Sequence, residues 1–216
     1  MFIFGAMRIA VIIPDRGDRP AFLANCLRMM EAQTLRPVQI ILVNDRPESE
    51  DKDITWRYRM GYQQVQKGID LVAFIENDDW YSPDYLETMW LEWHRAKCPD
   101  IFGTSYTIYY HIGIRKWFTM HHVHRSSAMS TVIRPHLPLS WPADNDPYTD
   151  LHLWRNVKGC TFTPSKHICL GIKHGVGLCG GVNHIDAMHR YVNEDNGLLA
   201  DTLDPESLQW YTRKLK

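Results

Sequence analysis

The chain has 216 residues, of which 44% are hydrophobic and 12% are aromatic, so it is long enough to bury the core of one domain. Its 24 lysines and arginines against 25 aspartates and glutamates give a net charge of −1, which excludes a strong overall field for nucleic acid. Five cysteines without a CxxC pair argue against a disulfide framework and a thiolate zinc site. We predict a single domain over residues 1–216 in a reducing compartment.

The N-terminal stretch MFIFGAMRIAVIIP is apolar but does not have the pattern of a signal peptide. Its basic residue, Arg8, falls inside the apolar run, and no small-residue cleavage site follows. Elsewhere the chain has no apolar run near the ~18 residues that a membrane span needs. The sequence therefore predicts a cytoplasmic protein without a membrane span.

Three apolar runs alternate with three amphipathic stretches in the first half of the chain. The strands are expected at 8–13, 38–45 and 70–77, and the helices at 20–33, 54–68 and 82–97. Gly68 is expected to close the second helix, and Ser82 to cap the third. The order β-α-β-α-β-α predicts an α/β fold of Rossmann type, with a mostly parallel sheet and helices on both faces.

Polar clusters follow all three predicted strands, at 14–16, 44–46 and 76–79. The carboxyl ends of parallel strands meet at one edge of a sheet, where ligands bind in such folds. The third cluster, in FIENDDWY, places three acids directly after a buried run, and buried charge is costly unless something compensates it. A metal ion, a basic side chain or an ordinary solvated turn would each account for these acids.

The second half is rich in aromatic residues and in loops. A strand pair turning near Gly113 is expected over 101–122, continued by residues 127–134, followed by a proline-rich loop and a short helix at 149–157. A last helix is expected from Pro205. The segment 115–125 mixes cations with aromatic residues, which fits an acceptor platform or simply a partly exposed strand pair.

Two stretches of the first half of the chain resemble the family-two-type glycosyltransferases of the GT-A fold. AVIIPDRGDRPAFLANCLRMMEAQTLRPVQIILVND is similar to their opening, and LVAFIENDDWYSPDYLETM is similar to their third-strand motif, an apolar run ending in Asp-x-Asp and followed by Pro-Asp-x-Leu. Through IKHGVGLCGGVNH the second half is most similar to short glycosyltransferases encoded by phages. The resemblance implies a GT-A-like fold, with a donor-binding half at 8–100 and an acceptor-binding, catalytic-base half at 101–216. For a phage protein the compartment would be the host cytoplasm.

The resemblance implies transfer of a sugar, with inversion, from a nucleotide-diphosphate donor, UDP being the most expected. Asp45 matches the family's residue that accepts a hydrogen bond from the base. Arg16 and Arg19 are candidate diphosphate contacts, with structural ion pairing as the alternative. Pro14 and Asn77, at the ends of the first and third strands, complete the predicted donor-binding set.

The resemblance also implies a divalent metal, Mn²⁺ or Mg²⁺. Asp78 matches the metal ligand, and Glu76 takes the place of the first acid of Asp-x-Asp, near the ribose or the metal. A cation held by carboxylates neutralises the charge that develops on a leaving diphosphate. His174 and His184 are candidates for a late histidine ligand, although most histidines in a chain with eleven of them are structural or exposed.

The catalytic base is expected at Asp150 in TDLHLWR, where the family places an aspartate at the start of a helix. Asp144, Asp146 and His152 are close enough in sequence to compete for this role. A carboxylate is also favoured at a helix N-terminus for capping alone. The candidate acceptors are a hydroxymethylated pyrimidine in DNA, a polysaccharide, a lipid-linked sugar and a protein hydroxyl.

Two other functions remain open from the sequence. A nucleotide-sugar-binding module without catalysis would explain why Glu76 and Thr149 stand where the family has its usual acids. A sugar-phosphate nucleotidyltransferase would bring a glycine-rich phosphate loop after the first strand, and PDRGDRP has only one glycine.

Overall fold

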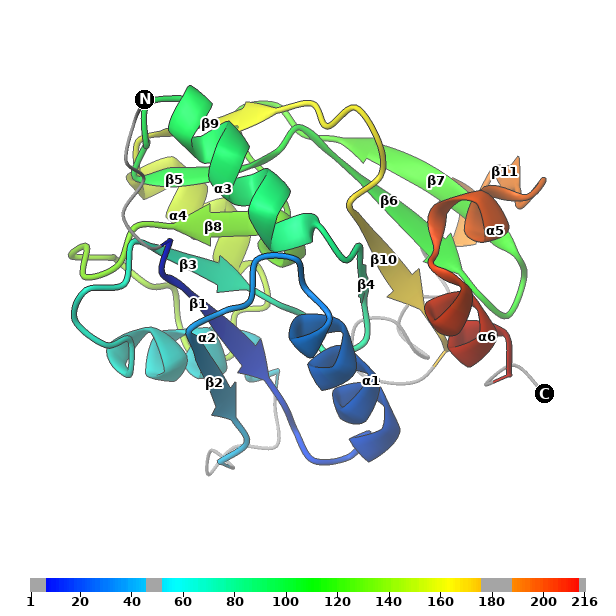
Figure 1. Cartoon of the computed structure of the whole chain (residues 1–216), viewed down its shortest axis with the longest axis horizontal. Helices are drawn as coiled ribbons and strands as arrows, with labels where there is room; N and C mark the ends of the chain where they lie inside the picture. Colours follow the sequence, from blue (N-terminus) through cyan, green and yellow to red (C-terminus); the bar gives the residue numbers. More distant parts are fainter. Residues whose placement is uncertain (1–6, 46–51, 176–187, 214–216) are drawn as a thin grey trace.

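The computed structural model describes residues 7–45, 52–175 and 188–213, which form two β-sheets with helices packed around them (Figure 1). The strands are β1 (Ile9–Pro14), β2 (Gln39–Val43), β3 (Leu71–Phe74), β4 (Trp80–Tyr81), β5 (Ile101–Thr104), β6 (Tyr106–His111), β7 (Lys116–His121), β8 (Thr131–Ile133), β9 (Gly159–Phe162), β10 (Cys169–Lys173) and β11 (Asn193–Glu194). The helices are α1 (Pro20–Glu31), α2 (Ile54–Gln63), α3 (Tyr85–Arg95), the short 3₁₀ helix η1 (Ala128–Ser130), α4 (Thr149–Asn156), α5 (Leu198–Thr202) and α6 (Pro205–Arg213). In the described part of the chain, no helix combines the length and the apolar character needed to cross a bilayer.

The larger sheet has the strand order β2-β1-β3-β8-β5-β9. β1 pairs in parallel with β2 and β3, β8 is antiparallel to β3 and β5, and β9 is parallel to β5. Within the described residues, every strand of this sheet except β8 therefore runs in one direction. The predicted mostly parallel sheet is confirmed, and its carboxyl edge lies where β1, β2 and β3 end.

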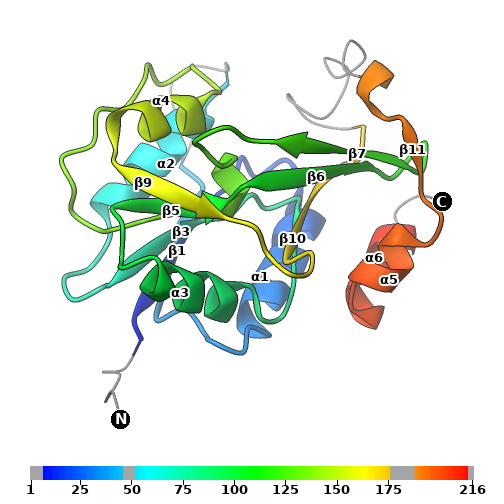
Figure 2. The same cartoon turned by 90° about the horizontal axis from the view of Figure 1, so that it is seen from above.

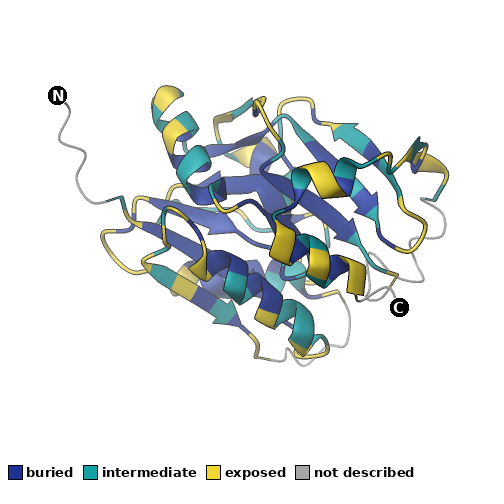
Figure 3. Ribbon diagram, turned by 45° about the vertical axis from the view of Figure 1, so that its right-hand side comes forward, coloured by how far each residue is buried: buried dark blue, intermediate teal, exposed yellow. Residues whose placement is uncertain are grey.

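The sheet is buried on both faces because its central strands alternate between two apolar cores. Ile9, Val11 and Ile13 of β1 belong to the core that includes α1 and α3. Ala10 and Ile12 belong to the core that includes α2 and α4. Figure 3 shows the resulting layers, with buried strands between helices whose outer faces are exposed. An unbroken apolar run such as the one in β1 is the expected signature of a strand covered on both sides.

Three boundary or burial predictions are corrected by the structure. β2 is an edge strand rather than a fully buried one, and Ile40 in it is exposed. α2 ends at Gln63, well before Gly68, because the chain turns there and buries Val65 against the sheet. α3 begins at Tyr85 rather than at Ser82, whose hydroxyl donates to the Asp84 carboxylate (2.8 Å).

The smaller sheet has the order β11-β7-β6-β10-β4. Its β6–β7 hairpin confirms the predicted aromatic strand pair around Gly113, but the first residues of the predicted span, 101–104, form β5 of the larger sheet instead. Residues 127–134 do not continue that pair. Instead β8 enters the larger sheet between β3 and β5, where Thr131, Val132 and Ile133 are all buried. The two helices predicted in the second half are confirmed as α4 and α6.

The two sheets are connected through the loop that carries the acidic cluster. β4 follows that loop directly and pairs antiparallel with β10, Tyr81 opposite Cys169 and Trp80 opposite Leu170. The carboxylate of Asp79 also accepts a hydrogen bond from the Ile172 amide (2.7 Å). Seen from above, β10 lies beside β6 within the smaller sheet (Figure 2). The last residues of β10 are therefore fixed against the acidic loop.

A buried histidine gives the fold a dependence on pH. His122 lies after β7 with its Nε2 2.9 Å from the Thr107 hydroxyl, and burial, followed by the charges of Arg125 and His121, lowers its pKa from 6.5 to about 4. The unfolded chain therefore binds more protons between these values, and the stability contributed by neutral His122 is lost as the pH falls from 6.5 toward 4. We expect the melting temperature to fall between pH 7 and pH 4.5, and to fall less in His122→Gln. Exposed His189→Gln is the control, and an equal fall in all three proteins would contradict the assignment.

Candidate functional site

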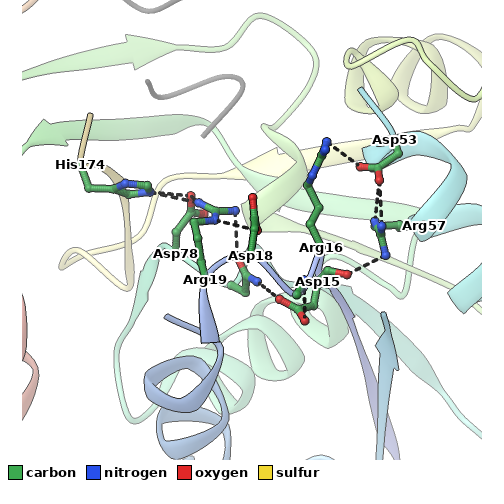
Figure 4. Close-up of polar contacts among 10 residues, drawn as sticks. Asp15, Arg16, Asp18, Arg19, Asp53, Arg57, Asp78 and His174 are labelled. Carbon is green, nitrogen blue, oxygen red and sulfur yellow. Dashed lines mark hydrogen bonds and ion pairs between the residues drawn. The ribbon is translucent and has the colours of Figure 1, made fainter. Parts of the chain in front are cut away.

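The polar clusters after β1, β2 and β3 meet at the carboxyl edge of the larger sheet, as the sequence predicts. The Asn77 side-chain amide donates to the Asp15 carboxylate (2.8 Å), which connects the loops after β3 and β1. Arg57 of α2 donates from one nitrogen to the main-chain carbonyls of Asp15 and Asp45, which connects the loops after β1 and β2. Figure 4 shows Arg57 and Asp15 together with Arg19, Asp78 and His174 at the strand ends.

Asp78 is in direct contact with two side chains of the site, those of Arg19 and His174. Its Oδ2 accepts a hydrogen bond from Arg19 (2.5 Å) and lies 3.0 Å from Nε2 of His174 (Figure 4). The His174 side chain is only 3% exposed and its ring packs against Phe22. Burial alone would raise the pKa of Asp78, but His174, Arg19 and Lys173 together hold it well below its usual range. Asp78 is therefore an ionised carboxylate contacted by residues from the first and second halves of the chain.

Asp78 and its two acidic neighbours form one cluster. Carboxylate oxygens of Glu76, Asp78 and Asp79 all lie within 4.8 Å of one another. Burial, followed by the like charges of Asp78 and Asp150, raises the pKa of Glu76 to about 7 against the opposing effect of Lys173. Burial and mutual repulsion thus disfavour the simultaneous ionisation of all three acids, and a bound cation would relieve both effects.

Lys173 is a candidate site residue that the sequence did not single out. Its ammonium group lies 5.2 Å from the centre of the Tyr109 ring, at the end of β10. Burial lowers its pKa, but the charges of Asp79, Glu76 and Asp78 outweigh burial and raise it. Lys173 is therefore a permanent cation facing the acidic cluster. Its position directly before His174 in IKHG was the available signal.

The residues present fit a hard divalent cation. Carboxylate oxygens are the preferred ligands of Mg²⁺ and Mn²⁺, and a histidine nitrogen suits Mn²⁺ better. One oxygen of Asp79, Oδ2, is buried and has no hydrogen-bond partner among the described residues, so the cluster contains an uncompensated acceptor. Glu76, Asp78, Asp79 and His174 are the described residues that could hold such an ion. His184, the other predicted histidine ligand, lies outside the described residues.

The remaining predicted donor-binding residues lie along the same edge. Pro14 ends β1 opposite Val43, and Arg16 forms an ion pair with Asp53 (3.6 Å). The Asp45 side chain is exposed, while its main-chain carbonyl accepts from Arg57 (2.8 Å). The structure therefore brings the first and second strand ends to one place through Arg57, a residue that the sequence reasoning had assigned only to a helix.

Asp150 lies in the first turn of α4 and is paired with Arg125 (2.6 Å). Burial raises its pKa, and the charge of Arg125 opposes that shift. Because the charge of Asp150 contributes to the raised pKa of Glu76, Asp150 lies within electrostatic range of the acidic cluster. Asp150 is thus a largely buried carboxylate held by Arg125 at the start of α4.

The residues that compete with Asp150 are engaged in other contacts. Asp146 lies 3.0 Å from His152 Nε2 and also accepts from the Tyr148 amide. Asp144 forms a two-pronged hydrogen-bonded pair with Arg59 of α2. The Asp144–Arg59 pair holds the loop before α4 against α2. Asp150 is paired as well, but it is the one of these acids whose charge contributes to the raised pKa of Glu76.

Comparison with known proteins identifies the fold. None of the protein-family models matches the chain. A protein named "Putative glycosyltransferase EpsH" from Bacillus subtilis (strain 168) is 32% identical over 87 aligned positions, an alignment that covers 32% of this chain and 25% of that protein. The chain thus matches about a quarter of the length of this curated relative.

Among solved structures, TarS of S. aureus is similar over 77% of this chain and 37% of its own, with 12% identity and a TM-score of 0.51. TarS 1–349 in complex with UDP-GlcNAc matches 97% of this chain and 80% of its own, with 12% identity and a TM-score of 0.53. The complex of the same fragment with UDP matches 94% of this chain and 78% of its own, with 12% identity and a TM-score of 0.52. At this level of identity the likeness shows the fold alone, and it confirms the predicted α/β fold of GT-A type.

Proposed function

We propose that this chain is a metal-dependent, inverting glycosyltransferase that takes a nucleotide-diphosphate sugar, most simply a UDP-sugar, and glycosylates an acceptor hydroxyl. The observation that carries the proposal is the meeting of three carboxylates with Arg19, Lys173 and His174 at the carboxyl edge of the sheet. Ligands bind at that edge in open α/β sheets. The match to a named glycosyltransferase and the fold shared with a UDP-GlcNAc complex support the same function.

The charges of the site suit a diphosphate and a cation together. Glu76, Asp78 and Asp79 would hold a divalent cation, which when bound neutralises charge on the diphosphate leaving group. Arg19 is placed to donate to diphosphate oxygens once its hydrogen bond to Asp78 is released. Lys173 supplies a second positive charge that needs no metal. Asp45 and the adjoining strand ends are left for the base and ribose.

Asp150 is the proposed general base. Inversion requires the acceptor hydroxyl to attack from the side opposite the leaving nucleotide, and a carboxylate must take its proton. A raised pKa makes Asp150 a stronger base, and Arg125 holds the carboxylate in place. Its first-turn position on α4 fixes the side chain on a regular element rather than on a loop.

The acceptor is proposed only as a hydroxyl group, with hydroxymethylated DNA as one class to test. The cations of the segment 115–125 are paired with acids in the structure: Arg115 with Asp195 (3.0 Å), Lys116 with Glu194 (2.7 Å) and Arg125 with Asp150 (2.6 Å). Binding a duplex normally requires several cations that neutralise phosphates. The pairing favours carbohydrate hydroxyls as the first acceptors to screen, with hydroxymethylated DNA as the contrasting class.

Calorimetric titration of UDP, with GDP, CDP and TDP as comparisons, tests the donor assignment. We expect one nucleotide to bind in Mn²⁺ and to lose most of its affinity in EDTA. Binding of no nucleotide under either condition would remove the proposed function and leave the fold as described.

A binding module without catalysis is the alternative that the same site allows, because Glu76 and Thr149 stand where the family has other acids. Turnover separates the two functions. An enzyme should slowly hydrolyse its UDP-sugar to UDP without an acceptor, in a reaction that stops in EDTA. Metal-dependent binding with no release of UDP over many hours would favour the binding module.

A further inference from the structure

Arg57 is a buried arginine that lies outside the acidic cluster and makes an unusual set of contacts. Its side chain is 2% exposed. A single nitrogen, Nη1, donates to three main-chain carbonyls: those of Asp15 (2.6 Å), Val43 (2.8 Å) and Asp45 (2.8 Å). These carbonyls belong to the ends of β1 and β2 and to the residues that follow them. Arg57 therefore links the segments that follow β1 and β2, next to the last paired residues of the two strands, Pro14 and Val43.

Asp53, one turn before Arg57, is shared between two arginines. Its Oδ2 accepts from Nε (3.0 Å) and Nη2 (2.8 Å) of Arg57, while its Oδ1 lies 3.6 Å from Nη1 of Arg16. Figure 4 shows the resulting chain of contacts from Arg57 through Asp53 to Arg16, beside the strand ends. Arg16 belongs to the same loop as Asp15 and Arg19. The loop after β1 is thus held at one end by Asp53 and at the other by Asp78.

The position of Arg57 depends on an unusually close approach of α2 to the sheet. A Cβ added at Gly61 would lie 2.4 Å from a methyl carbon of Ile12 in β1, so only glycine allows this packing. Arg57 is one turn earlier on the same helix. Because a buried charge is costly unless paired and fully hydrogen-bonded, an arginine at this depth is retained only with a complete set of partners. All three nitrogens of the Arg57 guanidinium have such partners.

We propose that Arg57 and Asp53 are positioning residues for the nucleoside half of the donor. They fix the backbone at Asp15 and Asp45 and the side chain of Arg16 before any ligand binds, while the acidic cluster acts on the diphosphate half. The inference rests on the proposed function and assigns the two halves of the donor to two different groups of residues. Loosening the Arg57 network should weaken recognition of the base and ribose and leave metal-dependent recognition of the diphosphate in place.

The test compares two probes in Mn²⁺, UDP and inorganic pyrophosphate. Asp53→Asn keeps the shape of the side chain but removes its charge, and Arg57→Lys keeps the charge but cannot reach all the partners of a guanidinium. We expect both variants to lose tenfold or more in affinity for UDP and less than threefold for pyrophosphate. Arg59→Lys is the matched control, because Arg59 lies on the same helix and pairs with Asp144 at the surface. It should leave both affinities unchanged.

Amide hydrogen exchange provides a readout that needs no nucleotide. The Asp15 amide donates to the Val43 carbonyl (3.0 Å), which is one of the carbonyls that Arg57 holds. Peptides containing residues 14–17 should exchange faster in Asp53→Asn and Arg57→Lys, while peptides from β5 should not change. If Arg57→Lys fails to fold, Asp53→Asn decides.

The outcomes separate the two proposals. Loss of UDP and pyrophosphate affinity in equal measure, or unchanged exchange at residues 14–17, would overturn the positioning role. If the wild-type protein binds neither probe, the proposed function fails, and the exchange measurement still decides whether Arg57 fixes the strand ends. Faster exchange with an unchanged affinity for UDP would also overturn the role in recognition.

Discussion

Replacing Asp78 with asparagine is expected to abolish metal-dependent nucleotide binding. The change removes one of three clustered carboxylates but keeps the size of the side chain. Even supporting residues around a metal site cost 10–100-fold in metal affinity when mutated, so a loss of about a hundredfold or more is expected for a direct ligand. The measurement is the dissociation constant of UDP at several Mn²⁺ concentrations and in EDTA.

Asp100→Asn is the matched control for this change. Asp100 directly precedes β5 and forms an ion pair (3.4 Å) with Arg134, which directly follows the antiparallel strand β8. Asp100 therefore lies at the edge of the sheet opposite the acidic cluster. Its affinity for UDP and its metal dependence should equal those of the wild type. Unchanged metal dependence in Asp78→Asn would contradict the assignment of Asp78. Although Arg19 loses its ionised partner in Asp78→Asn and becomes available to a diphosphate, this should not restore the metal-dependent part of the UDP affinity.

Replacing Asp150 with asparagine is expected to leave nucleotide binding intact while sugar transfer falls by about a hundredfold or more, the scale for loss of a general base. Asparagine can still accept a hydrogen bond from Arg125, so the N-terminus of α4 should remain in place. The measurements are the UDP dissociation constant and kcat for transfer, once an acceptor has been found. Hydrolysis of the donor by water should be affected less than transfer.

A weakened affinity for UDP equal to the loss in kcat would show that Asp150 supports the donor site rather than the acceptor. If transfer survives in Asp150→Asn, Asp146→Asn becomes the next variant. Asp146 lies just before α4 and contacts His152 on that helix (3.0 Å). Asp201→Asn, an exposed aspartate on α5, is the control and should transfer at the wild-type rate.

The parallel part of the fold could be predicted because each strand there carries its own local signal. β1 is a run of β-branched residues without alternation, and the polar clusters mark the strand ends. β8 could not be placed in this way. Its sequence is apolar and β-forming, which suits either sheet, and the choice depends on the space between β3 and β5, to which the chain returns from far away in sequence.

The acidic half of the site and Arg19 could also be predicted, but Lys173 and Arg57 could not. Asp78 stood out because charge after a buried run is unusual. Lys173 ends β10, a short strand that was not among the predicted elements, and its effect arises only when β10 packs against the acidic loop. Arg57 was missed for a different reason, because an arginine in an amphipathic helix is normally assigned to the solvent face.

The acidic loop continues directly into β4, and β4 pairs with β10 of the second half. This connection limits which parts of the chain can be exchanged for parts of another protein in a chimera. Exchanging residues 101–216 for those of another protein would remove Lys173 and His174 together with the strand that donates a hydrogen bond to the Asp79 carboxylate. A chimera made to change the acceptor would therefore also change the donor site. New acceptor preferences should be sought by substitutions in the loops around α4, because the rest of the second half cannot be exchanged as a module.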